Sequence, residues 1–242
     1  MSVMDSDVDG MRERFAAIQR RVAAAAARGG RAASDVLVIG ACKTMPPALL
    51  AAALAAGVRI FGENRLQELV EHRAAMAASL AADPSVQFHF IGALQTNKAR
   101  KAAEMCSLIH SVDRLALADV LDRYGQQRGR AVSILIEVNV SREASKSGVL
   151  PEELGSLSRH LATRDGIIVA GLMCIPAPSD DPTGARAPFA RMRQLLREMR
   201  ESGVFALPPQ ELSMGMSGDF ELAIEEGATM VRIGTALFGA RG

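Results

Sequence analysis

The stretch VLVIGACK, residues 36–43, is an apolar, β-branched run that ends in a lysine. Such a run is typical of a buried strand in a parallel sheet, whose carboxyl end lies where ligands usually bind. The chain has only four lysines against 24 arginines, so Lys43 is not one of many interchangeable surface cations. An amine at a strand end can form a Schiff base with an aldehyde if burial or neighbouring cations keep it neutral. A strand that merely ends in a solvated charge is the alternative.

A short apolar run followed by a helical segment recurs along the rest of the chain. Eight such strands, with no hairpin signals between them, predict a single-domain α/β fold, a closed parallel (β/α)8 TIM barrel. An open, doubly wound sheet is the alternative, which the lack of a glycine fingerprint after the first strand weakens. The expected strands are 36–43, 58–61, 86–91, 107–112, 132–140, 167–174, 211–214 and 230–233.

Helices are expected between these strands and before the first one. An amphipathic helix over residues 11–28, with Phe15, Ile18 and Val22 on one face, should pack against the outside of the barrel. We therefore expect one domain over residues 1–242, with 1–30 as the outer helix and 35–242 as the barrel. The helices between strands are expected at 48–56, 64–80, 96–105, 114–124, 151–163, 188–202 and 219–226, with a long proline-containing loop before 188.

The composition points to a small-molecule partner. With 28 basic and 27 acidic residues the net charge is +1, which favours neither nucleic acid nor an anionic membrane. Cys42, Cys106 and Cys174 lie in or beside apolar runs without metal-type spacing, as expected of buried thiols in a reducing compartment. No metal site is expected. The first ten residues lack the basic and apolar segments of a secretory signal, and no apolar run could span a bilayer, so we expect a cytoplasmic protein.

In a TIM barrel the functional groups lie on the loops that follow the strands. The loops after the last two expected strands supply small side chains, hydroxyl donors and free amides, which are typical of a phosphate site. Alternatively, Ser217-Gly218-Asp219 is only an N-cap of the helix that follows. The residues in question are Gly215, Ser217, Gly218, Gly234 and Thr235.

Arg232 interrupts the apolar run MVRI, so its buried guanidinium needs a partner and could donate a hydrogen bond to a ring nitrogen. His89 lies within a strand, either as a hydrogen-bonded core residue or as a site residue. Asn64 and Asn139 could bond a ring hydroxyl or cap a loop. Glu63 and Glu137 show no recognisable pairing, which gives hydrolytic acid–base chemistry no support.

A lysine that captures aldehydes, a phosphate pocket and an arginine for a pyridine nitrogen together indicate pyridoxal 5′-phosphate, PLP. The motifs that carry these groups resemble the PLP homeostasis protein family over nearly the whole chain from residue 36. Two positions depart from the family pattern, Cys42 where a serine often precedes the lysine and Ala93 where histidine is frequent. The matching motifs are FGEN (61–64), FHFIG (88–92), LQTNK (94–98), GLM (171–173), LSMGMS (212–217) and VRIGT (231–235).

The resemblance implies a barrel like the N-terminal domain of alanine racemase, with PLP as cofactor held as a Schiff base on Lys43 and Arg232 facing the pyridine nitrogen. It implies a carrier or regulator in vitamin B6 and amino-acid homeostasis, without established turnover and without a catalytic residue. Apo forms of PLP-dependent enzymes would be its recipients. By the same resemblance Ser213, Met216, Ser217, Gly234 and Thr235 surround the phosphate, and Asn64 and His89 are further cofactor contacts.

A small PLP-dependent racemase or lyase that uses Lys43 as its single base is the competing hypothesis. A permanently charged arginine opposite the ring nitrogen weakens the electron sink that such chemistry needs. Alanine racemase also has a second base, a tyrosine from an added β domain, whereas Tyr124 is the only tyrosine here and falls on an expected outer helix. Without that domain we expect a monomer. Lys146, in the loop after the fifth strand, is either a secondary PLP site or part of a solvated loop.

Overall fold

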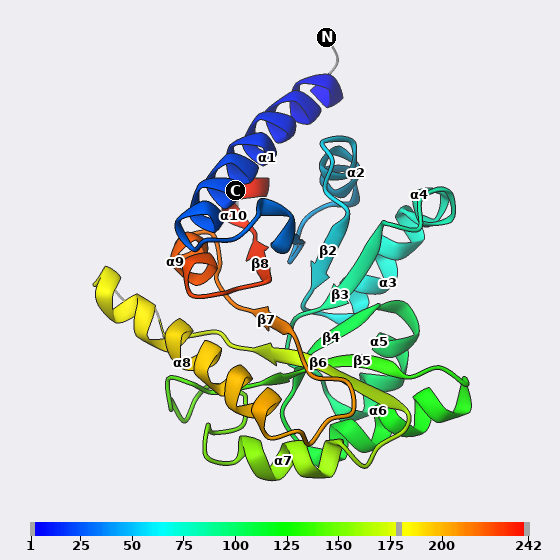
Figure 1. Cartoon of the computed structure of the whole chain (residues 1–242). Helices are drawn as coiled ribbons and strands as arrows, with labels where there is room; N and C mark the ends of the chain where they lie inside the picture. Colours follow the sequence, from blue (N-terminus) through cyan, green and yellow to red (C-terminus); the bar gives the residue numbers. More distant parts are fainter. Residues whose placement is uncertain (1–2, 178–180, 240–242) are drawn as a thin grey trace.

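The computed structural model describes residues 3–177 and 181–239 of the chain. Its eight strands are parallel and close into a barrel in the order β1 to β8, with β8 pairing back onto β1 (Figure 1). The predicted TIM barrel is therefore confirmed. The strands are β1 (Leu37–Ala41), β2 (Ile60–Glu63), β3 (Gln87–Phe90), β4 (Leu108–Val112), β5 (Val132–Glu137), β6 (Ile167–Met173), β7 (Glu211–Ser213) and β8 (Met230–Ile233).

Helices connect the strands and cover the outside of the barrel. None within the described ranges is long and apolar enough to cross a membrane. They are α1 (Val3–Arg28), α2 (Pro47–Ala55), α3 (Leu66–Ala75), α4 (Ala77–Ala82), α5 (Ala99–Met105), α6 (Leu115–Gln127), α7 (Leu154–Leu161), α8 (Pro182–Glu201), α9 (Phe220–Glu225) and α10 (Thr235–Phe238), with short 3-10 turns at Ala33–Asp35 and Thr96–Lys98.

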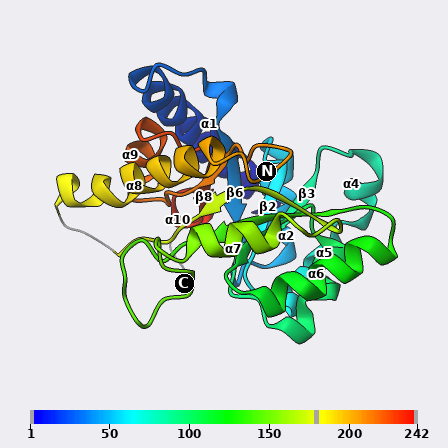
Figure 2. The ribbon, with the colours of Figure 1, turned by 60° about the horizontal axis from the view of Figure 1, so that its bottom comes forward.

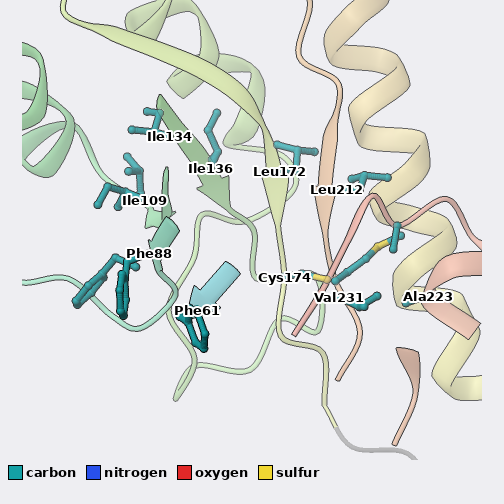
Figure 3. Packing of buried hydrophobic residues seen from close by; sticks show 14 of the residues in the cluster. Phe61, Phe88, Ile109, Ile134, Ile136, Leu172, Cys174, Leu212, Ala223 and Val231 are labelled. Atoms are coloured by element: carbon teal, nitrogen blue, oxygen red, sulfur yellow. The ribbon is translucent and has the colours of Figure 1, made fainter. Parts of the chain in front are cut away.

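The strands bury both faces. Side chains that point outward, among them Phe61, Phe88 and Ile109, pack between the barrel and its helices (Figure 3). Their neighbours in sequence point inward, because side chains alternate along a strand. The inward set forms a separate apolar layer at the bottom of the barrel, made of Ile39, Ile60, Leu108, Leu135, Met173 and Met230.

Helix α1 packs beside α2, α9 and α10, so the N-terminal helix lies next to the last helix of the described chain (Figures 1 and 2). Phe15, Ile18 and Val22 are buried in the main apolar cluster, as expected from their spacing. Ion pairs join Arg21 to Glu221 and Arg28 to Glu225. The outer N-terminal helix is thus confirmed, and it begins earlier than the predicted residue 11.

Several predicted boundaries were wrong for local reasons. Helix α8 begins at Pro182 and not near Pro188, because the Asp181 carboxylate accepts the Gly184 N–H at 3.0 Å and caps the helix upstream. The single helix expected over 64–80 is α3 and α4, which meet at Met76, whose φ of −100° and ψ of 11° leave the helical region while its side chain stays buried. Strand β5 ends at Glu137, so Asn139 follows the strand.

Candidate functional site at the barrel mouth

The inner face of the barrel becomes polar one layer above its apolar floor. His110 follows Leu108 by two positions, and Arg232 follows Met230 in the same way, so each points inward above an apolar residue. His89 on β3 and Ser213 on β7 complete this layer, and all four side chains are buried. The barrel therefore presents a polar, enclosed platform beneath its carboxyl-end loops.

Three hydrogen bonds fix the Arg232 guanidinium. Nη1–H donates to the Ser213 carbonyl at 2.8 Å and to the Ser213 hydroxyl at 2.6 Å, and Nη2–H donates to the Cys174 carbonyl at 2.8 Å. A buried cation held by two oxygens of β7 and by the carbonyl of the residue after β6 has little freedom to turn. The sequence predicted that a buried Arg232 guanidinium would need a partner. Its partners are two main-chain carbonyl oxygens and one hydroxyl oxygen.

A chain of hydrogen bonds leads from Arg232 to His89. Because the Ser213 hydroxyl accepts from Arg232, its own proton is directed to His110 Nδ1, 2.9 Å away. His110 Nε2–H then donates to His89 Nδ1 at 3.0 Å. Burial lowers the pKa of His89 to about 4, and burial, with smaller effects of the adjacent His89 ring and of Arg232, holds the pKa of His110 well below its usual value. The network therefore assigns both rings as neutral at pH 7.

Lys43 follows β1 at the edge of this platform. The strand pairing extends one residue past β1, through Cys42 N–H to the Gly62 carbonyl at 2.9 Å, and Lys43 comes next, half-buried. Its parity matches that of Ile39, which points into the barrel and pairs with Arg232 on β8. Lys43 Nζ makes no hydrogen bond or ion pair with residues 3–177 or 181–239. This amine is free to meet a ligand at the mouth.

The loops after β7 and β8 contact each other beside β1. Arg232 N–H donates to the Gly215 carbonyl at 3.0 Å, and Ala236 N–H donates to the Ser217 hydroxyl at 3.2 Å. Gly234 lies over Ala41, whose carbonyl would be 3.7 Å from a Cβ at position 234. Within the described residues, the Ser217, Gly218 and Gly234 amides donate no hydrogen bond. With the exposed Thr235 hydroxyl they form a donor set that fits a phosphate group.

Met216, Ser213 and Asn64 are three other predicted cofactor contacts. The Met216 N–H donates to Asp219 Oδ1 at 2.6 Å, so only its side chain, 39% exposed, faces outward. The Ser213 hydroxyl is occupied by Arg232 and His110, so it supports the guanidinium and is not free for a phosphate. Asn64 follows β2, half-buried, with its backbone so close to Gly92 that a Cβ there would lie 2.4 Å from the Asn64 carbonyl oxygen.

The second candidate lysine differs from Lys43 in having partners. Lys146 Nζ lies 2.9 Å from the Glu143 carboxylate and 3.4 Å from the Ile175 carbonyl. Asn139 Nδ2 donates to the Glu143 and Lys146 carbonyls at 2.8 and 3.3 Å, which fastens the loop that carries Lys146. Asn139 therefore caps a loop, one of the two roles considered for it.

Two buried carboxylates, Glu63 and Glu137, have surroundings that were not predicted from the sequence. Glu63 Oε1 lies 2.6 Å from His72 Nδ1, and His72 Nε2–H donates to the Met45 carbonyl at 2.9 Å. Burial raises the pKa of Glu63 to about 7, against the opposing effect of His72. Glu137, two positions beyond the inward Leu135, also has its pKa raised to about 7, by burial and then by Asp113, while Arg232 acts in the opposite direction.

His72 and His110 were not singled out from the sequence, although the spacing of buried residues in each element could have identified them. His72 stands three residues after the buried Leu69 on one face of α3, and His110 shares the inward parity of Leu108 on β4. Either spacing could have been used to predict a buried, hydrogen-bonded ring.

Comparison with known proteins assigns the chain to a family. The family model described as alanine racemase, N-terminal domain, matches residues 14–242. A pyridoxal phosphate homeostasis protein of Aquifex aeolicus is 41% identical over 229 residues, which cover 95% of this chain and 97% of the relative. The chain belongs to the pyridoxal phosphate homeostasis protein family. A family member from Pseudomonas aeruginosa is 43% identical over 229 residues, 95% of each chain.

One similar protein of known structure contains bound PLP. PipY of Synechococcus elongatus, with PLP bound, superimposes with a TM-score of 0.80 at 35% identity, covering 95% of this chain and 100% of PipY. The resemblance to the PLP homeostasis protein family that the motifs indicated is thus confirmed, as is the likeness to the alanine racemase N-terminal domain.

Proposed function

We propose that this protein binds PLP at the barrel mouth and holds it as a Schiff base on Lys43. One juxtaposition carries the proposal: the half-buried amine of Lys43, which has no partner in the described chain, stands beside two touching loops with free amides. The PLP that a relative of known structure binds has an aldehyde for such an amine and a phosphate for such loops.

The other side chains have distinct roles in this proposal. Ser217, Gly234, Thr235 and the Met216 side chain surround the phosphate, with amides of the same loops as donors. Arg232 faces the pyridine nitrogen, and Ser213 orients Arg232. When bound, PLP supplies an electrophilic aldehyde and an electron-withdrawing ring. Asn64 and His89 are further cofactor contacts from the β2 and β3 side of the mouth.

The proposed role is to hold and deliver PLP in the cytoplasm, and so to keep vitamin B6 and amino-acid pools in balance. Arg232 is charged at all relevant pH values, and a cation opposite the ring nitrogen disfavours the protonated ring that carbanion chemistry uses. Tyr124 cannot serve as a second base at the mouth, because it lies on α6 with Arg100 and Arg128 over its ring at 5.6 and 5.1 Å. Apo forms of PLP-dependent enzymes are the proposed recipients.

A slow racemase or lyase with Lys43 as its single base is the second candidate. Glu137 is the observation in its favour, because a carboxyl with a pKa of about 7 near Arg232 suits proton transfer. An exposed surface carboxyl would not have this property.

Two assays of the PLP-loaded protein distinguish between the two candidate functions. In the first, it is incubated with L- and D-amino acids, which are then analysed by chiral chromatography and for keto acids. In the second, it is mixed with an apo-enzyme that needs PLP, whose activity is followed. We expect recovery of the apo-enzyme and no inversion. Sustained inversion or keto-acid formation that disappears in Lys43→Ala would overturn the carrier role.

A further inference from the structure

The turn that follows Lys43 has a strained backbone. Thr44 has a φ of 61°, in the left-handed region that glycine adopts freely and β-branched residues avoid. Arg142 is the other residue besides glycine with a positive φ in the described chain, and it lies far from β1 in sequence. A threonine in this conformation, directly after the proposed PLP-binding lysine, needs a compensating contact.

Helix α3 supplies that contact. The Thr44 N–H donates to Glu68 Oε2 at 3.0 Å, and the Thr44 hydroxyl donates to the Lys43 carbonyl at 2.7 Å. The Glu68 side chain is only 18% exposed, so its charge-assisted hydrogen bond is partly shielded from water. Its other oxygen, Oε1, lies 3.5 Å from Arg65 Nη1.

A second contact from α3 reaches the next residue. His72 Nε2–H donates to the Met45 carbonyl at 2.9 Å, and Glu63 holds the opposite side of the ring. The Met45 N–H in turn donates to the Cys42 carbonyl at 2.9 Å and closes the turn around Lys43. Helix α3 thus forms hydrogen bonds to two successive residues of this turn, Thr44 and Met45. Thr44 is the one with the strained backbone.

We propose that Glu68 is a positioning residue for Lys43: by accepting the Thr44 N–H, it holds the left-handed turn that keeps the lysine side chain at the barrel mouth. The proposal rests on the proposed function, because Lys43 is taken to be the amine that meets PLP. Without the Glu68 acceptor, Thr44 is free to return to a negative φ. That change rotates the peptide groups next to Lys43 and redirects its side chain.

Glycine at position 44 separates this role from a purely electrostatic one. Glycine adopts a positive φ without steric strain, so a Thr44→Gly chain does not need Glu68 to offset strain in the turn. If Glu68 acted only as an anion near the Lys43 amine, glycine at position 44 would not replace it. The double variant therefore decides between the two roles.

The experiment compares Glu68→Ala, Thr44→Gly and the double variant with the unchanged protein. The rate of PLP attachment to Lys43 is followed by visible absorbance, and the adduct is trapped with borohydride and mapped by peptide mass spectrometry. Exchange of the Thr44 amide, measured by NMR without PLP, reports the turn directly. Glu71→Ala removes an exposed carboxylate from the same helix and is the matched control. Circular dichroism checks that each variant is folded.

We expect Glu68→Ala to slow attachment about tenfold and to speed Thr44 amide exchange, because a strained conformation loses its support. Thr44→Gly, the double variant and Glu71→Ala should attach PLP at close to the unchanged rate. Attachment in the double variant as slow as in Glu68→Ala, or no effect of Glu68→Ala, would overturn the positioning role. Failure of the unchanged protein to attach PLP at Lys43 would instead overturn the proposed function, and the amide exchange would still test the turn.

Discussion

Arg232 donates hydrogen bonds to both oxygens of Ser213, the carbonyl at 2.8 Å and the hydroxyl at 2.6 Å. The hydroxyl donates its own hydrogen bond to His110, so Ser213 joins a buried cation to a neutral histidine pair. The orientation of the guanidinium is therefore set by the barrel itself, before any ligand binds. The predictions below follow from this platform and from the loops above it.

Ser213→Ala should lower the free energy of unfolding by about 1–3 kcal/mol, because it leaves His110 Nδ1 buried without a partner. Chemical denaturation at pH 7.5 measures the loss. Ser217→Ala is the comparison, since this half-buried hydroxyl accepts one loop N–H at 3.2 Å and should cost less. Equal losses in the two variants would argue against the buried network.

Arg232→Gln should change the absorbance of bound PLP and its response to pH more than it changes PLP affinity. The guanidinium is proposed to face the ring nitrogen, while phosphate contacts supply most of the binding. Spectral titration and equilibrium dialysis measure the two effects. Arg197→Gln, on the exposed surface of α8, is the control. A spectrum unchanged from that of the unmodified protein would mean that Arg232 has only a structural role.

Glu137→Gln should stabilise the protein at alkaline pH and leave it unchanged near pH 4.5. The Glu137 pKa is about 7 in the folded chain, against an ordinary value of 4.5. Between these values the folded chain binds more protons than the unfolded chain, so stability from this group is complete below pH 4.5 and lost as the pH rises through 7. At pH 8 the gain from glutamine should reach about 3 kcal/mol.

Denaturation of both proteins from pH 4.5 to 8 tests this prediction. His89 and His110 act in the opposite direction, since their lowered pKa values cost stability as the pH falls below 6.5, but they are common to both proteins and cancel in the difference. The exposed Glu71→Gln should show no pH-dependent gain. A constant difference across the range would mean that Glu137 is not held protonated by its surroundings.

Gly215→Ala should destabilise the loop after β7, whereas Gly218→Ala should be tolerated. Gly215 has a φ of 90°, and a Cβ there would lie 2.9 Å from Phe220 Cα and 2.6 Å from Ala223 Cβ. A Cβ at Gly218 meets no atom within 4 Å. We expect a loss of about 1–3 kcal/mol for the first and weaker PLP binding through the displaced amides. Similar thermal melting and similar PLP affinity of the two variants would contradict this account of the loop.

The sequence was sufficient for the barrel because its signal is repeated eight times. Lys43, two residues past the end of β1, and Arg232, which interrupts the run MVRI, were also found from the sequence, since an unusual residue in or just after an apolar run is visible locally. Helix boundaries were less accurate where a side chain such as Asp181 capped a helix upstream of a proline.

The contacts within the site could not be predicted, because they join residues far apart in the chain. His110 and Ser213 are 103 positions apart, and only closure of the barrel brings their side chains to 2.9 Å. Likewise, the support of Thr44 by Glu68 depends on a backbone angle that no pattern of residue types specifies.

The position of the covalent attachment tests the central claim most directly. PLP-loaded protein is reduced with borohydride, digested and mapped by mass spectrometry, alongside Lys43→Ala and Lys146→Ala. We predict a single reduced adduct on Lys43, with the visible band and the adduct lost in Lys43→Ala and retained in Lys146→Ala. An adduct that persists in Lys43→Ala, or one that maps to Lys146 in the unchanged protein, would contradict the account.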